Sequence, residues 1–209
     1  MSPSSASATR RYRWWHAAAV GVFANAASAL PAGYNGDENY YESLRTPPGA
    51  PPAWVFAPVW AANNVLTLSS NLRIANLPAD TPLRRRGLVA EAANWALFST
   101  FSGLFFGLRS PVLGAIDTAA GLVLTGYSVG VTARLDRRAA WALVPRLAWL
   151  GYAAYVSTAT AVNSPDRLLR DAPRRVRQFR HGHPLICGTP AVEVVPGRPS
   201  PSATESGSR

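Results

Sequence analysis

The sequence predicts an all-α membrane protein, a bundle of five transmembrane helices. Hydrophobic residues make up 48% of the 209 residues and charged residues only 15%, against roughly 25% in globular domains. Five long apolar windows follow one another along the chain. Arginines gather in the gaps between these windows, which is where membrane proteins carry positive charge.

The windows have the lengths that membrane spans require, since a spanning helix needs about 20 mostly apolar residues. They cover residues 14–30, 54–77, 88–108, 111–133 and 139–162. Only Arg109 and Ser110 separate the third window from the fourth, so we expect a tight antiparallel hairpin there. Small residues are dense, as in TAAGLVLTGYSVGVTA, and they let transmembrane helices pack closely.

Three parts of the chain follow from the windows. Residues 1–13 form a polar and basic tail, and residues 14–163 form the transmembrane domain. Residues 164–209 begin with a basic segment and end in a Ser-, Pro-, Ala- and Gly-rich segment that we expect to be disordered. The first window also fits a cleaved signal peptide, because a basic start with Arg10 and Arg11 precedes its apolar run.

The net charge of +10 comes entirely from arginine, because the chain contains no lysine. Basic proteins often bind nucleic acid, but these arginines lie between apolar windows. We therefore expect membrane lipid and no nucleic acid as a partner. The acidic first loop and the basic segments 84–86 and 134–138 favour a cytoplasmic amino terminus. The arginine-rich carboxyl tail opposes it, so the orientation stays open.

Charged residues inside the windows are candidates for function, because charge is costly within a membrane. Asp117 fits either a buried ligand or helix contact or a place near the interface. Arg146 is expected to extend to the headgroups, with an ion pair to Asp117 as the alternative. Glu91 is expected at the interface and Arg73 at a helix boundary. The asparagines of the second window are expected to form interhelical hydrogen bonds: Asn63, Asn64 and Asn71.

Tryptophans fall into two groups by position. Four lie near window ends and fit an aromatic belt at the membrane interface: Trp14, Trp15, Trp54 and Trp141. Trp60 and Trp149 lie one or two turns deeper. A belt explains these two less well, whereas a flat apolar ligand would stack on them.

No catalytic motif emerges from the residues, so enzymatic activity is left open. A P-loop and a dinucleotide-binding glycine motif are both absent. The best metal candidate is the trio of His181, His183 and Cys187. It lacks a fourth ligand, and we expect no metal there. The basic tail around it fits binding to anionic headgroups and equally fits a solvated terminal helix.

The stretch YYESLRTPPGAPPAWVFAPVW resembles the signature of the TspO/translocator protein family, the tryptophan-rich sensory proteins. In that family an aromatic pair and a leucine precede a proline-rich loop that runs into Pro-Pro-x-Trp-x-Phe-x-Pro-x-Trp. Two later blocks, LFFGLRSPVLGAIDTA and ALVPRLAWLGYAAYVSTATAVN, are similar to the family as well. The likeness covers roughly residues 14–163 and makes the first window the family's first helix rather than a signal peptide.

This resemblance implies a multi-pass protein of a bacterial cell membrane, often dimeric, with a pocket beneath the first loop. Family members bind tetrapyrroles such as protoporphyrin IX and heme, and animal relatives also bind cholesterol and synthetic drugs. No permanently bound cofactor is implied. The ligand-lining positions of the family map to Tyr41, Trp60, Trp149 and Ala153, with Trp54 and Asp117 as weaker candidates.

The prolines of the first loop have a physical role in this interpretation. Their fixed φ angles hold a short non-helical lid over the pocket mouth. Pro58 is expected beyond the first turn of its helix, where it would kink the helix and open room beside Trp60.

Several positions depart from the family pattern. Counting back from Phe105–Phe106, the Asn and Trp of the third helix are replaced by Phe98 and Phe101. We therefore expect a more apolar pocket that lacks one hydrogen-bond donor. Ser157 replaces an Asn and Arg146 replaces a Tyr in the fifth helix, and the proposed cholesterol motif is absent.

Three functions are compatible with the sequence. The first is a membrane receptor or sensor that binds a tetrapyrrole and regulates a tetrapyrrole or stress response. The second is an enzyme that degrades porphyrin under light. The third is a transporter of porphyrin, sterol or lipid, which gains little support because inverted repeats and broken helices are absent.

Overall fold

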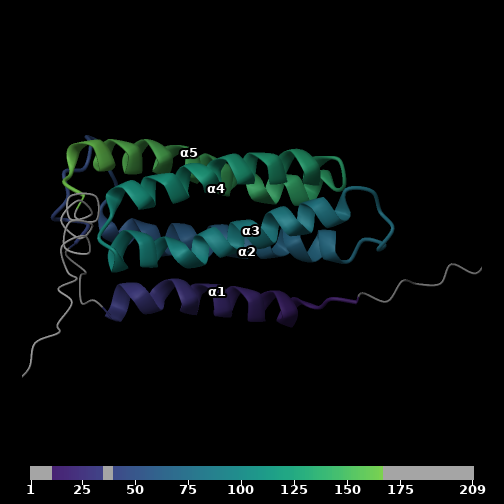
Figure 1. Cartoon of the computed structure of the whole chain (residues 1–209). Helices are drawn as coiled ribbons and strands as arrows, with labels where there is room; N and C mark the ends of the chain where they lie inside the picture. Colours follow the sequence, from purple (N-terminus) through teal and green to yellow (C-terminus); the bar gives the residue numbers. More distant parts are fainter. Residues whose placement is uncertain (1–10, 35–39, 167–209) are drawn as a thin grey trace, which may run out of the picture.

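The computed structural model describes residues 11–34 and 40–166, which form a bundle of five long helices (Figure 1). The helices are α1 (Trp14–Tyr34), α2 (Phe56–Ala75), α3 (Arg84–Ser102), α4 (Pro111–Ala133) and α5 (Arg137–Asn163). The helices α2 and α3 lie between α1 on one side and the α4–α5 pair on the other (Figure 1). These residues contain no strand, so the predicted all-α bundle of five helices is confirmed.

Two short helical elements flank the long helices, one before α2 and one after α3. A 3-10 turn, η1 (Ala53–Val55), leads into α2, and a π-helical segment, η2 (Gly103–Gly107), ends α3. Because α2 begins at Phe56, Pro58 lies within its first turn. The first-turn amides of a helix have no intrahelical partner, so proline is tolerated there. The expectation that Pro58 lies beyond the first turn is wrong.

The hairpin between η2 and α4 is as short as the sequence predicts. Arg109 adopts a left-handed conformation with φ of 49°, and Ser110 caps α4 by accepting a hydrogen bond from the Leu113 amide at 3.1 Å. The hydroxyl of Ser110 donates to Asp166 at 2.6 Å, and the Val112 amide donates to the same carboxylate at 3.2 Å. The segment after α5 is thereby held at the amino terminus of α4.

At the opposite end of the bundle, the Asp136 side chain connects α5 to α2. Its carboxylate caps α5 by accepting hydrogen bonds from the amides of Arg138 and Ala139, at 2.8 and 3.1 Å. It also pairs with Arg73 at the end of α2, with 2.6 Å between nitrogen and oxygen. The prediction that Arg73 is a boundary residue agrees with this position.

Replacing Asp136 by alanine is expected to cost about 1 kcal/mol, the usual loss for a helix cap. Burial alone raises the pKa of Asp136, but the hydrogen bonds from Ala139 and Arg73 outweigh it and leave the pKa below its usual range. The stabilisation is therefore present above the ordinary aspartate pKa near ~4 and is lost as the pH falls through the lowered pKa. In thermal unfolding in detergent, the wild type should have a higher Tm than the Asp136→Ala variant at neutral pH, and this difference should disappear in strong acid. A Tm difference that is the same at both pH values would contradict this role.

Apolarity alone identifies one span. By length and composition, α4 is the helix among the described residues that qualifies for crossing a membrane, with a mean hydropathy of 1.4. The other windows fall below this criterion although they form long helices. In α2 and α3 the buried positions include Asn63, Thr67, Glu91 and Asn94, and these polar side chains lower the average.

Candidate functional site

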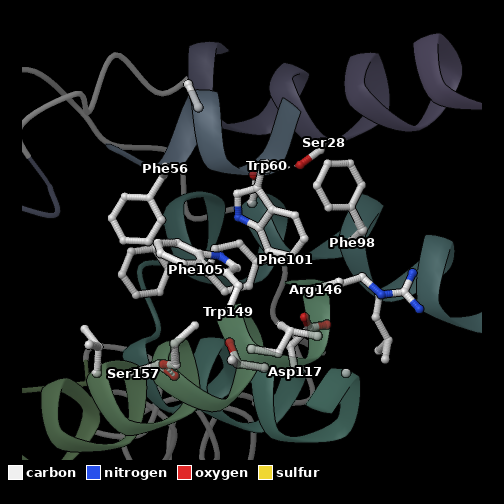
Figure 2. A pocket seen from close by; sticks show the side chains of 18 of the residues that line it. Ser28, Phe56, Trp60, Phe98, Phe101, Phe105, Asp117, Arg146, Trp149 and Ser157 are labelled. Atoms are coloured by element: carbon white, nitrogen blue, oxygen red, sulfur yellow. Dashed lines mark hydrogen bonds between the residues drawn. The ribbon is translucent and has the colours of Figure 1, made fainter. Parts of the chain in front are cut away.

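A cavity of about 670 Å³ lies among α2, α3, α4 and α5, beneath the segment that follows the first loop. Small-molecule sites in proteins typically occupy about 300–1,000 Å³ and are mostly apolar. Aromatic side chains from three helices and η2 form most of the wall (Figure 2): Phe56, Trp60, Trp95, Phe98, Phe101, Phe105, Phe106 and Trp149. The cavity therefore has the size and the surface of a site for a large, flat, apolar ligand.

The aromatic rings support one another across the helices. Trp60 of α2 packs on Phe98 of α3 with ring centroids 5.2 Å apart. Phe101 stacks on Phe105 at 5.5 Å with an interplanar angle of 10°. The α4 backbone approaches so closely at Gly114 that an added Cβ would lie 2.6 Å from Phe105. The cavity wall is thus fixed by packing rather than by flexible side chains.

Polar groups within this wall are few. Asp117 of α4 is buried, and Thr100 lies 3.5 Å from its carboxylate as a hydrogen-bond donor. Of the two positions that the sequence allowed, the buried one is correct. The indole nitrogen of Trp149 is buried without a hydrogen-bond partner among the described residues, and Figure 2 shows it within the ring of cavity side chains. An unsatisfied buried donor costs about 1–3 kcal/mol, so a ligand acceptor at this point would be favoured.

All six residues that the resemblance assigned to a ligand site lie around this cavity: Tyr41, Trp54, Trp60, Asp117, Trp149 and Ala153. Trp54 is the most peripheral, because its side chain is 73% exposed. Their contact with a ligand stays a prediction. Ser157 lines the cavity too, but its hydroxyl donates to the carbonyl of Ala153 at 2.6 Å.

Phe98 and Phe101 line the cavity, and the third helix also presents an asparagine and a tryptophan that the sequence did not single out. Asn94 and Trp95 lie about one turn before Phe98. The amide of Asn94 donates to Ala90 and Ser128 at 3.2 and 3.3 Å. The helix therefore supplies an amide whose N–H groups are already used within the protein.

Arg146 and Glu91 occupy positions that the sequence did not predict. Arg146 is buried, and its guanidinium contacts the Glu91 carboxylate through two hydrogen bonds of 2.6 and 3.1 Å. Both expectations for Arg146, extension to the headgroups and pairing with Asp117, are wrong. The expectation of an interfacial Glu91 is wrong as well. A charge buried in the bundle needs a partner, and α3 provides it for α5.

Two hydrogen bonds hold the lid, residues 40–52, against α5 and its C-cap, and a third lies within the lid itself. The Tyr41 hydroxyl donates to the carbonyl of Pro51 at 2.9 Å within the lid. Tyr152 of α5 donates to the carbonyl of Gly49, and the Arg45 amide donates to Ser164 at 2.9 Å. Burial raises the pKa of Tyr41, and nearby Tyr152 adds to this rise. Tyr41 therefore stays neutral and keeps its donor proton at physiological pH.

Replacing Tyr152 by phenylalanine is expected to loosen the lid, because it removes the bond to Gly49 and leaves the ring. A net hydrogen bond is worth about 0.5–1.5 kcal/mol, so amide exchange of the lid should rise about two- to tenfold. Hydrogen exchange followed by mass spectrometry measures this. The Tyr155→Phe variant is the control, because Tyr155 is an exposed residue of the same helix. Equal exchange in the two variants would argue against the latch.

The remaining predictions concern the bundle surface and the tail. The four tryptophans assigned to a belt are all exposed in the structure: Trp14, Trp15, Trp54 and Trp141. Asn64 donates to Asn25 of α1 at 3.2 Å, which confirms an interhelical hydrogen bond. The candidate metal ligands His181, His183 and Cys187 lie outside the described residues. Within those residues, no group of three His, Cys, Asp or Glu could hold a metal.

A five-helix bundle with exposed tryptophans near its helix ends and an aromatic cavity between the helices fits the class of helical membrane proteins. The model of the TspO/MBR family matches residues 16–162, and the chain belongs to this family. Because TspO/MBR proteins are membrane proteins, the five helices form a membrane bundle.

Individual relatives agree with this assignment. The chain is 27% identical to the tryptophan-rich protein TspO of Chlorobaculum tepidum over 139 residues, which cover 66% of this chain and 85% of the relative. It is 36% identical to the translocator protein of Ovis aries over 130 residues, which cover 56% and 70% of the two chains. It is 30% identical to protein CrtK of Rhodobacter capsulatus over 124 residues, which cover 59% and 74%.

Proposed function

We propose that this protein is a receptor of a bacterial cell membrane that binds a tetrapyrrole, protoporphyrin IX or heme, in the cavity beneath the lid. Binding would regulate a tetrapyrrole or stress response. The observation that carries the proposal is the aromatic cavity of about 670 Å³, with Trp60 and Trp149 in its wall. A conjugated macrocycle is flat and apolar, so it gains from both stacking and burial in such a site.

The polar groups of the cavity fit the same ligand class. The free indole N–H of Trp149 suits an acceptor on the ligand, such as a propionate oxygen. Asp117 is buried in the wall and suits a donor, such as a pyrrole N–H. A free-base porphyrin carries both kinds of group. In heme, iron takes the place of the two pyrrole protons, so this donor is missing. We therefore expect the free base to bind at least as well as heme.

The test is a titration of protoporphyrin IX into the purified protein in detergent, in the dark. We expect saturable one-site quenching of tryptophan fluorescence together with a shift of the porphyrin absorbance. A Trp141→Phe variant serves as the control, because Trp141 is exposed and lies outside the cavity wall. Quenching that never saturates, or that depends on Trp141, would refute the proposed receptor.

A second candidate is light-dependent porphyrin breakdown. The observation that favours it is that four indoles line one cavity, where an illuminated porphyrin would lie next to oxidisable side chains: Trp54, Trp60, Trp95 and Trp149. The same complex should then be illuminated and returned to the dark. An absorbance change that is irreversible and requires both light and protein supports breakdown, and a stable spectrum supports binding alone.

A further inference from the structure

The cavity ends at a similar level on α2, α3, α4 and α5, which supply most of its lining. Its deepest lining residues are Asn64 of α2, Asn94 of α3, Gly121 of α4 and Arg146 of α5. One turn further from the lid, the buried side chains on these helices are Thr67, Glu91, Thr125 and Leu143. These buried side chains therefore close the cavity along the bundle axis.

Most of that blocking layer is polar and internally bonded. We name Thr67, Asn71, Glu91 and Arg146 the polar floor. The Arg146–Glu91 pair has side chains only 7% and 6% exposed, and Arg146 also reaches the Thr67 hydroxyl at 3.5 Å. With the Asn71 amide oriented so that both of its ends are satisfied, its nitrogen donates to Glu91 at 2.9 Å. The floor thus ties α2, α3 and α5 together.

The polar floor also holds the aromatic wall. In the same orientation, the Asn71 oxygen accepts a hydrogen bond from the Trp95 indole at 2.9 Å. Trp95 meets Phe98 edge to face at 5.7 Å, and Phe98 packs on Trp60. Figure 2 shows Arg146 at the edge of the cavity with its guanidinium turned away from the aromatic rings. The guanidinium is therefore hydrogen-bonded within the polar floor and is not directed at the aromatic part of the cavity.

We infer that the polar floor determines the class of ligand, admitting a broad flat ring system and excluding a rod-shaped sterol that lies along the helices. This inference rests on the proposal that the cavity binds a ligand. A rod that continues past Asn94 would collide with the Arg146 and Glu91 side chains, which their ion pair holds across its path. A macrocycle spreads across the cavity above the floor and leaves the pair intact.

Two double variants separate bulk from charge. Glu91→Ala with Arg146→Ala removes both charges and most of the bulk, whereas Glu91→Leu with Arg146→Met removes both charges and keeps the bulk. Because both partners are removed together, neither variant leaves a lone buried charge. The probes are a fluorescent sterol, dehydroergosterol, and protoporphyrin IX in the dark, each titrated into full-length protein in detergent.

The alanine pair is expected to bind the sterol at least about tenfold more tightly than the wild type, a change of about 1.4 kcal/mol. The Leu/Met pair keeps the bulk of the floor and should therefore bind the sterol as weakly as the wild type does. Unchanged sterol binding in the alanine pair, or an equal gain in both pairs, overturns the inference. A purely structural role of the floor would lower affinity for both probes and would not produce a gain.

A third variant guards against a folding defect. Glu91→Ala with Arg146→Met opens only the α3 side of the floor, so its sterol affinity should lie between those of the other two pairs. If the alanine pair does not fold, this variant replaces it in the test: sterol binding tighter than in the Leu/Met pair supports the inference, and equal sterol binding overturns it. The wild-type porphyrin titration tests the proposed function separately. A wild type that binds no porphyrin, with the sterol series as expected, would overturn the proposed ligand and support the floor.

Discussion

Replacing Arg146 alone by methionine is expected to destabilise the bundle by about 3–5 kcal/mol, the cost of leaving a buried charge without its partner. Glu91 would keep its carboxylate within the bundle, 5% exposed, with the Asn71 amide of α2 as its remaining hydrogen-bond donor. Replacing Glu91 by leucine at the same time removes the stranded charge. The double variant should therefore recover most of the loss, and denaturant or thermal unfolding in detergent measures it.

The surface pair at the other end of the bundle provides a matched control. Arg73 forms an ion pair with Asp136 at the same 2.6 Å distance, but its side chain is 47% exposed. Exposed pairs are worth about 0–1 kcal/mol, so Arg73→Met should cost far less than Arg146→Met. Equal losses in these two variants, or a double variant no more stable than Arg146→Met, would show that the buried pair does not act as described.

Replacing both Trp60 and Trp149 by alanine is expected to weaken tetrapyrrole binding about ten- to hundredfold. Each aromatic contact contributes about 0.5–1.5 kcal/mol beyond the area that it buries, and the two together account for this range. Trp149 also loses its indole N–H, which has no hydrogen-bond partner among the described residues and could donate to a ligand. Porphyrin absorbance, rather than tryptophan fluorescence, measures the affinity, because the variant lacks two fluorophores.

The control for this variant is Trp14→Ala with Trp141→Ala, which removes two exposed indoles. It should leave the affinity unchanged, and unfolding curves of both variants should confirm that each is folded. Phenylalanine at Trp60 and Trp149 should give an intermediate affinity, because the ring is kept and the indole is lost. Unchanged affinity in the alanine double variant would refute this cavity as the site.

The helices could be predicted from the sequence because their ends are marked locally. Pro111 and Ala133 bound both the fourth window and α4. The short Arg109–Ser110 gap leaves room only for a hairpin, which the structure contains. Trp60 and Trp149 stood out because they lie deeper than a belt allows, and both line the cavity.

The buried ion pair could not be predicted in the same way. Glu91 and Arg146 are separated by 55 residues, and each taken alone resembles a residue at a membrane boundary. They meet only because α3 and α5 both pack against α2 and α4. The signal that could have suggested a pair was the presence of opposite charges inside two apolar windows, where each charge needs a partner.

Asn94 and Trp95 could not be assigned to the cavity for a different reason. A register counted back from Phe105–Phe106 leads to Phe98 and Phe101, which line the cavity, and Asn94 lies one turn before Phe98 on the same helix face. Nothing in the sequence says how far along α3 the cavity extends, so its depth had to come from the structure.

The most direct test of the central claim is the structure of the protein crystallised in the dark with protoporphyrin IX. We expect one macrocycle between Trp60 and Trp149, above Asn94, with the Glu91–Arg146 pair intact below it. The same crystals would show whether the Trp149 indole donates to the ligand. Density for the porphyrin on the lipid-facing surface, with the cavity unchanged, would contradict the account.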